Sequence, residues 1–107
     1  MSAVISRELK VRVARRFHER ALGLIVEPQP ISGQGLLFER CAGVHTFFMR
    51  YPIDVVFLDR DSRVLKVAHH VKPWRLVWCR GAHQVLELRQ GDASLWGVRE
   101  QQPLRWS

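Results

Sequence analysis

The sequence predicts a small, mainly β domain (α+β by strict count), built as a compact barrel or sandwich-like sheet. We expect six or seven short strands with one or two short helices. Three observations lead to this fold class. Short β-branched and apolar runs alternate with turn residues along most of the chain. Only two short segments, a helix over 16–25 and a single turn over 93–96, are expected to be helical. Apolar residues make up 47% of the 107 residues, enough for one core.

The first half of the chain contains one expected helix and several strands. Residues 9–13 alternate apolar and basic side chains, which is typical of a half-buried strand. Residues 16–25 place their apolar side chains on one helical face, whereas residues 27–35 hold two prolines and two glycines and are expected to form a loop. A brief strand over 36–38 and an alternating strand over 44–49 follow.

The clearest pattern is a hairpin in the middle of the chain. Residues 53–58 are almost wholly apolar and β-branched, so we expect a central strand buried on both faces. Residues 59–62 form a polar turn, and residues 64–67 return as the second strand.

The remaining elements are shorter. Residues 71–79 continue extended, with a break or an edge at the proline, and residues 85–88 form another strand. Asp92 is expected to N-cap a single helical turn that stops at Gly97. Residues 103–106 are expected to close the sheet as an edge strand. We expect one domain over 1–107, with residues 1–8 as a flexible lead-in.

The positive charge is compatible with anionic partners but specifies none. The net charge is +7, most of the cations are arginine, and no basic tail is present. Nucleic acid is a partner class suggested by this charge, although a coding bias towards arginine explains it equally well. A small molecule or a protein is the favoured partner.

The cysteines and apolar runs exclude several classes. Cys41 and Cys79 lie far apart without zinc-ligand spacing, so we expect no metal, no cofactor and no disulfide. The N-terminus has no apolar leader, which favours the cytoplasm. No apolar run approaches the roughly 18–20 residues that cross a bilayer, so we expect no membrane span.

The stretch from Cys41 to Leu88 resembles a known family. The resemblance rests on His-Thr-Phe-Phe-Met at 45–49, Pro-Ile-Asp-Val-Val-Phe-Leu-Asp at 52–59, Pro-Trp-Arg at 73–75 and Val-Leu-Glu-Leu at 85–88, with Val64 and Gly91. Ala-Leu-Gly-Leu at 21–24 and Gly-Leu-Leu-Phe at 35–38 extend it. The sequence is similar to the prokaryotic family called domain of unknown function 192 from about residue 9 to residue 104.

The resemblance implies a compact β-rich domain and no activity, because the family has no established biochemical role. The sequence departs from the family pattern at two points. Ser62 stands where the family tends to have glycine, and Gln-Gln-Pro at 101–103 replaces a Gly-Asp pair.

One set of candidate ligand-binding residues surrounds the loop between two strands: His45, Met49, Arg50, Asp54 and Glu87. Asp54 interrupts an apolar strand, and a buried carboxylate needs hydrogen bonds or a cation. It is expected either to bind loop backbone, with Arg50 as a partner, or to orient His45. Glu87 is interpreted as lying on the solvent face of its strand, with a pocket shared with His45 as the alternative.

A hydrolase-like enzyme would use Cys41 or His45 with Asp54, as nucleophile, base and orienting group. The spacing matches no known hydrolase signature, and the catalytic residues stay unknown. Cys41, His45 and Met49 have copper-type side chains four residues apart, but in a strand His45 and Met49 would lie about 13 Å apart. The sequence therefore predicts no metal site and favours binding over catalysis.

A second candidate site is the row Lys72, Trp74, Trp78 and Arg80, with Arg75 on the opposite face. Aromatic platforms beside cations are typical of single-stranded nucleic-acid binders. We interpret the two tryptophans as core residues from which the cations reach outward. The adjacent histidines at 69 and 70 are interpreted as ordinary surface residues.

These observations favour a non-catalytic module that binds a small ligand or a protein near the loop from His45 to Asp54. A single-stranded nucleic-acid binder and a hydrolase-like enzyme remain the alternatives.

Overall fold

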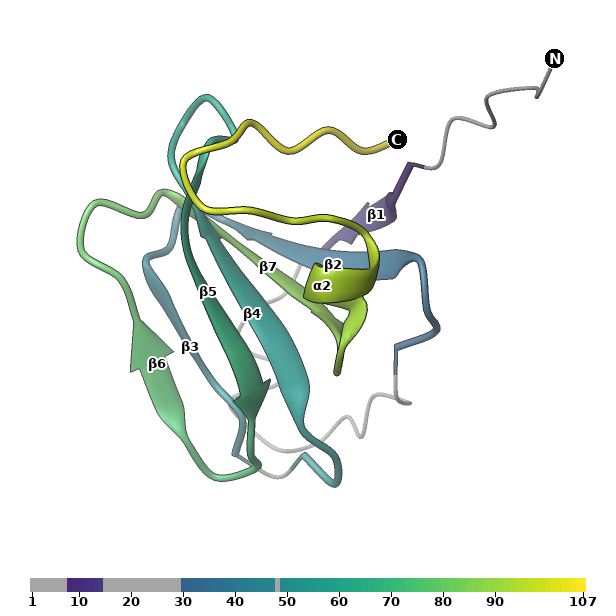
Figure 1. Ribbon diagram of the computed structural model, residues 1–107. Coiled ribbons are helices and arrows are strands. Elements are labelled where there is room, and N and C mark those ends of the chain that lie inside the picture. Colours follow the sequence, from purple (N-terminus) through teal and green to yellow (C-terminus); the bar gives the residue numbers. More distant parts are fainter. Residues whose placement is uncertain (1–7, 15–29, 48) are drawn as a thin grey trace, which may run out of the picture.

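A computed structural model describes residues 8–14, 30–47 and 49–107 (Figure 1). The helix expected over 16–25 lies outside these residues, as do most of the lead-in expected over 1–8 and the first three residues of the loop expected over 27–35. Residues 30–33 of that loop precede β2 and are not part of a strand.

The fold is mainly β, as predicted. β1 (Lys10–Val13), β2 (Gln34–Glu39), β7 (Gln84–Arg89), β4 (Ile53–Leu58) and β5 (Val64–Val71) form a five-stranded sheet in the order β1-β2-β7-β4-β5. Strands β1 and β2 are parallel, and the other pairs are antiparallel. A second sheet pairs β3 (Gly43–His45) with β6 (Leu76–Trp78). The short helix α2 spans Asp92–Leu95.

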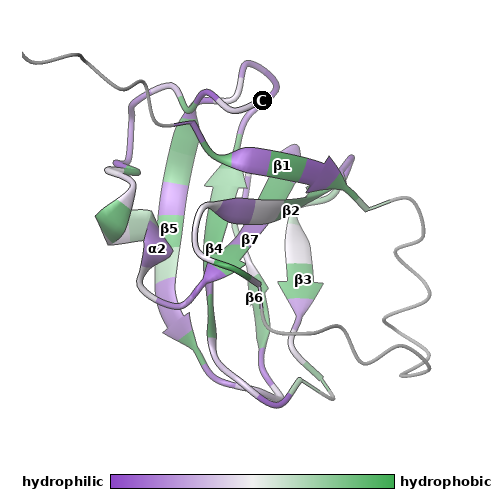
Figure 2. Cartoon of the chain, turned by 90° about the vertical axis from the view of Figure 1, so that its right-hand side faces the viewer, coloured by the Kyte–Doolittle hydropathy of each residue, from purple (hydrophilic) through white to green (hydrophobic). Residues whose placement is uncertain are grey.

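The two sheets form a sandwich-like arrangement and do not close into a barrel. We call the β3–β6 pair the ribbon. The ribbon and α2 lie on opposite sides of the five-stranded sheet (Figures 1 and 2). Each side therefore has its own apolar cluster, and the sheet separates them.

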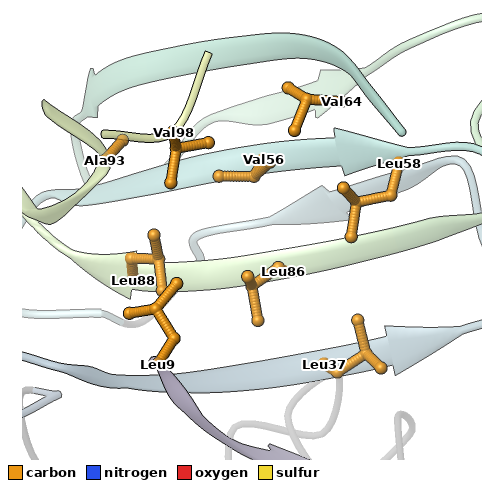
Figure 3. Close-up of a cluster of buried hydrophobic side chains, with 9 residues drawn as sticks. All are labelled: Leu9, Leu37, Val56, Leu58, Val64, Leu86, Leu88, Ala93 and Val98. Atoms are coloured by element: carbon orange, nitrogen blue, oxygen red, sulfur yellow. The ribbon is translucent and has the colours of Figure 1, made fainter. Parts of the chain in front are cut away.

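Strand β4 is buried on both faces because it lies between these clusters, which confirms the expected central strand. On the α2 side, Val56 and Leu58 of β4 contact residues from β7, α2 and the C-terminal segment (Figure 3). On the ribbon side, Val55 and Phe57 contact Val44 of β3 and neighbouring residues. The alternating side chains of one strand thus join both layers.

Two expectations near the C-terminus are wrong. Gly91, with a φ of 90°, is the N-cap of α2, and Asp92 is the first helical residue. The Asp92 carboxylate instead accepts hydrogen bonds from the Ser32 hydroxyl and the Gly33 N–H, at 2.9 and 2.7 Å. The expected closing strand at 103–106 is reduced to isolated bridges between Arg63 and Pro103 and between Leu9 and Trp106.

The alternating strand expected over 44–49 ends at His45. Thr46 turns the chain there because its buried side chain is bound to the segment before β6. The second strand of the central hairpin is longer than expected and runs to Val71.

Candidate functional site

The outer side of the ribbon carries a continuous row of exposed rings and apolar side chains. Phe47, Trp74, Leu76 and Trp78 are 37%, 56%, 60% and 65% exposed, and His45 is half-buried beside them. We call these five residues the aromatic face. Large exposed apolar surfaces on a small domain are typical of binding sites.

Strand register explains why these side chains point outward. Val44 pairs with Val77, and both pack towards the sheet. The flanking pairs, Gly43 with Trp78 and His45 with Leu76, therefore point the other way. Trp78 lies so close to Gly43 that a Cβ there would be 3.0 Å from the Trp78 Cβ.

Three of the rings form a stack. The His45 and Phe47 centroids are 4.7 Å apart with the planes inclined by 25°, and those of Phe47 and Trp74 are 5.9 Å apart at 26°. The Phe47 N–H donates to His45 Nδ1 at 3.3 Å, which fixes the imidazole relative to the turn. These rings therefore form an ordered platform.

Thr46 holds the platform from below. Its hydroxyl donates to the Lys72 carbonyl at 2.7 Å and accepts the Arg75 N–H at 2.9 Å. Its backbone carbonyl accepts the Trp74 N–H at 2.9 Å, and Trp74 has a φ of 65°. Trp74 thus keeps a left-handed conformation that is unusual for a bulky residue, because the turn around Thr46 is fully bonded.

Basic side chains border the aromatic face. Lys72 and Arg80 are exposed, at the two ends of the segment that contains β6. The Arg75 guanidinium lies 3.4 Å from the Pro73 and Trp74 carbonyl oxygens, which keeps it beside the platform. Arg50 is exposed three residues after Phe47.

The interpretation of Trp74 and Trp78 as core residues is therefore wrong. Sequence reasoning also missed Phe47 and Leu76. A signal was present, because Trp74, Leu76 and Trp78 share strand parity with Lys72 and Arg80. Cations on one face of a strand indicate that the same face meets solvent.

Asp54 lies on the opposite side of the sheet from His45. Its buried carboxylate accepts the His70 N–H at 3.1 Å and the N–H groups of Gly91 and Ala93, each at 3.0 Å. It thus binds the backbone at the start of α2, in the manner of a loop-binding carboxylate. The expected cluster of His45 with Asp54 is not assembled.

A different histidine approaches Asp54. The pairing of β4 with β5 shifts by one residue between Ile53 and Val55, and this bulge sets both histidines of β5 opposite Asp54. The His69 Nδ1 lies 4.0 Å from Asp54 Oδ2, and its side chain is half exposed. Sequence reasoning missed this contact because a bulge leaves no pattern in strand alternation.

Cys41 and Glu87 lie on the ribbon side of the sheet. Glu87 is buried, so its placement on a solvent face is wrong. Burial raises the pKa of the Cys41 thiol, the nearby Glu87 carboxylate raises it further, and a hydrogen bond from Gly43 opposes them. A raised pKa disfavours the thiolate, which argues against Cys41 as the nucleophile of the hydrolase alternative. Met49 packs against the apolar cluster on the same side.

Within the described ranges, no three His, Cys, Asp or Glu side chains are placed to hold a metal ion. No helix in this part of the chain has the length and hydrophobicity needed to cross a membrane.

The comparisons with known proteins identify the family. The family model of domain of unknown function 192, described as "Uncharacterized ACR", matches residues 2–106. The chain belongs to this family. A UPF0127 protein from Pyrococcus horikoshii is 40% identical over 75 residues, an alignment that spans 67% of this chain and 64% of that protein. A UPF0127 protein from Pyrococcus abyssi is 31% identical over 106 residues, covering 83% and 87% of the two chains.

Two crystal structures share the fold of this member of the family. A protein of unknown function from Novosphingobium aromaticivorans has a TM-score of 0.75 at 25% identity, covering 90% of this chain and 74% of its own. A candidate transcription regulator from Sinorhizobium meliloti has a TM-score of 0.71 at 22% identity, covering 89% and 78%. At that identity, the second likeness shows the fold alone.

Proposed function

We propose that this protein binds single-stranded nucleic acid on the aromatic face. Bases stack on Trp74 and Trp78, and Lys72, Arg75 and Arg80 contact the phosphates. The observation that carries the proposal is the pair of exposed tryptophans on a ribbon bordered by cations. Such binders combine a basic track with aromatic platforms that accept any base.

Charge favours nucleic acid over a protein partner. The chain carries a net charge of +7, and the aromatic face has three exposed cations along the β6 segment. Lys72 and Arg80 flank the rings at both ends, an arrangement that suits an extended polyanion.

The proposal keeps the non-catalytic binding module favoured by the sequence but moves its site. Of the five candidate ligand-binding residues, His45 belongs to the aromatic face and Arg50 is exposed close to it in sequence. Asp54 lies on the other side of the sheet, and Glu87 and Met49 lie towards the interior. The function would be exercised in the cytoplasm, the compartment that the sequence favours.

Fluorescence anisotropy with a labelled oligothymidylate of about 12 nucleotides tests the proposal. We expect Trp74→Ala and Trp78→Ala each to weaken binding about 5- to 150-fold, because stacking of one base contributes roughly 1–3 kcal/mol. Leu95→Ala is the matched control, since Leu95 is equally exposed but lies on α2. It should bind like the parent.

Absent binding by the parent protein, or equal binding by both tryptophan variants and the parent, would contradict the proposal. Sedimentation of the parent alone completes the test. A stable dimer that Trp78→Ala dissociates would show that the aromatic face pairs with a second copy of this chain, and would also contradict the proposal.

A further inference from the structure

A surface hollow opens where the ribbon joins the five-stranded sheet. It has a volume of about 430 Å³ and is lined by Glu39, Arg40, Arg60, His83 and Gln84. These residues come from the end of β2, the turn between β4 and β5, and the start of β7. Two guanidinium groups outnumber the single carboxylate, so the hollow favours an anion.

The walls of the hollow are anchored by hydrogen bonds. The backbone of His83 accepts the Cys41 N–H at 3.2 Å and donates to the Leu58 carbonyl at 2.8 Å. The Gln84 Nε2 donates to the Asp59 carbonyl at 3.0 Å. The hollow is therefore built on fixed backbone from three segments of the chain.

The turn that carries Arg60 is also fixed. The Asp59 Oδ1 accepts the Asp61 N–H at 2.8 Å and the Arg63 N–H at 2.9 Å. Asp59 therefore closes the turn around Arg60 with its own side chain. Arg60 itself is exposed and lines the hollow, so its guanidinium is accessible to a ligand there.

Arg40 occupies a backbone conformation that favours glycine. Its φ is 55°, in the left-handed region, where a residue with a Cβ costs of order 1 kcal/mol or more. The chain keeps a long cationic side chain at this position despite that cost. Residues held in this way cluster at ligand-binding sites.

The chain leads from the Trp78 end of the aromatic face to the hollow along both connections of the ribbon. Gly43 pairs directly with Trp78, and Arg40 precedes Gly43 by three residues, which spans at most about 10 Å of chain. On the other side, the connection from β6 to β7 leads from Trp78 past Arg80 to His83. Both connections run to the same end of the molecule (Figure 1).

We propose that this hollow binds a phosphate group, with Arg40 and Arg60 as the donors that hold its oxygens and His83 as a third donor. The preferred source of this phosphate is a bound nucleic-acid strand that leaves the aromatic face at Trp78, and to that extent the inference rests on the proposed function. The same donors would also take the phosphate of a small phosphorylated compound.

The test compares Arg60→Ala and Arg40→Gly with Arg99→Ala. Arg40→Gly removes the side chain while relieving the left-handed strain, so loss of binding cannot be attributed to unfolding. Arg99 is exposed beyond α2 and serves as the charge-matched control. We expect each hollow variant to weaken oligothymidylate binding about 3- to 10-fold. The slope of the logarithm of the binding constant against the logarithm of the salt concentration should become shallower by about 0.7.

A second arm titrates the parent protein and Arg60→Ala with inorganic phosphate and follows the amide NMR signals of residues 39–40, 60 and 83–84. Saturable shifts in the parent protein that Arg60→Ala abolishes would support a phosphate site in the hollow. If no oligonucleotide binds in that case, a small phosphorylated compound is the source of the phosphate. If both hollow variants bind the oligonucleotide as well as Arg99→Ala does, the hollow does not hold a phosphate of the nucleic-acid strand. The phosphate site itself is overturned when inorganic phosphate also leaves these signals unchanged.

Discussion

Asp54 is a buried carboxylate whose sequence context suggests catalysis but whose contacts are structural. It has no exposed surface, and its two oxygens accept three backbone N–H groups from β5 and the start of α2. Hydrogen bonds to an ionised acceptor contribute roughly 1.5–3 kcal/mol each at most. Asp54 therefore joins the β5 bulge to α2 across the edge of the sheet.

Asp54→Asn is expected to destabilise the protein by about 2–3 kcal/mol, because the amide NH₂ would face backbone donors. The melting temperature should fall by roughly 10–20 °C. His45→Ala, on the outer ribbon, should change the free energy of unfolding by under about 1 kcal/mol. Thermal melts followed by circular dichroism measure both, and a larger loss for His45→Ala would refute this assignment.

Cys41 is expected to react slowly with iodoacetamide at neutral pH. Burial and the Glu87 carboxylate raise the pKa of its thiol, so the thiolate that reacts is scarce. The rate should keep rising with pH beyond the range in which an exposed cysteine has levelled off. Mass spectrometry of timed alkylation, with Cys79→Ser to isolate Cys41, measures this rate. Rapid modification at pH 7 would restore the hydrolase alternative.

At the scale of elements, the ribbon depends on its attachments. Its strands are three residues each, and an isolated two-stranded pair of this size is marginally stable. Val44 and Val77 anchor it to the apolar cluster, and Thr46 binds the turn that precedes β6. The aromatic face is therefore as ordered as the turn around Thr46.

Thr46→Val is expected to loosen the ribbon while the main sheet stays intact. Valine matches the shape of threonine but leaves the Arg75 N–H without its side-chain acceptor and the Lys72 carbonyl without its donor. The stability cost should be about 1–3 kcal/mol. Hydrogen exchange by NMR should show faster exchange at residues 74–78 and unchanged protection in β4 and β7. Uniform acceleration throughout the chain would contradict this local role.

Elements with strong local patterns were predictable from sequence. The apolar run at 53–58 specifies a strand with two buried faces, and the polar turn after it specifies the hairpin. Asp92 misled the prediction because its carboxylate bonds to Ser32 and Gly33, about sixty residues away in sequence. Local capping patterns do not encode such long-range partners.

The site was less predictable than the fold. Hydrophobicity places tryptophan in the core, whereas the aromatic face depends on which parity of residues 72–80 meets the sheet. That choice follows from the Val44–Val77 pair, which joins segments more than thirty residues apart. The hollow likewise combines three segments that no spacing in the sequence connects.

At the scale of the molecule, both sides of the main sheet hold an apolar cluster, and the proposed binding face lies on the outer side of the ribbon. The α2 side holds one apolar cluster and the contacts of Asp54 and Asp92, whereas the ribbon exposes the aromatic face and leads to the hollow. Binding variants at the ribbon surface should therefore leave the melting temperature nearly unchanged. With three phosphates contacted, affinity for a single strand should fall about 20-fold between 50 and 200 mM salt.

The most direct measurement is NMR mapping of an oligothymidylate on the isotope-labelled protein at low salt. Binding on the aromatic face predicts saturable shifts in the amides of residues 45–47 and 74–80 and in the indole N–H signals of Trp74 and Trp78. Signals of α2 and of Trp96 should stay in place. Shifts confined to α2 and the C-terminal segment, or no shifts at all, would contradict the proposed function.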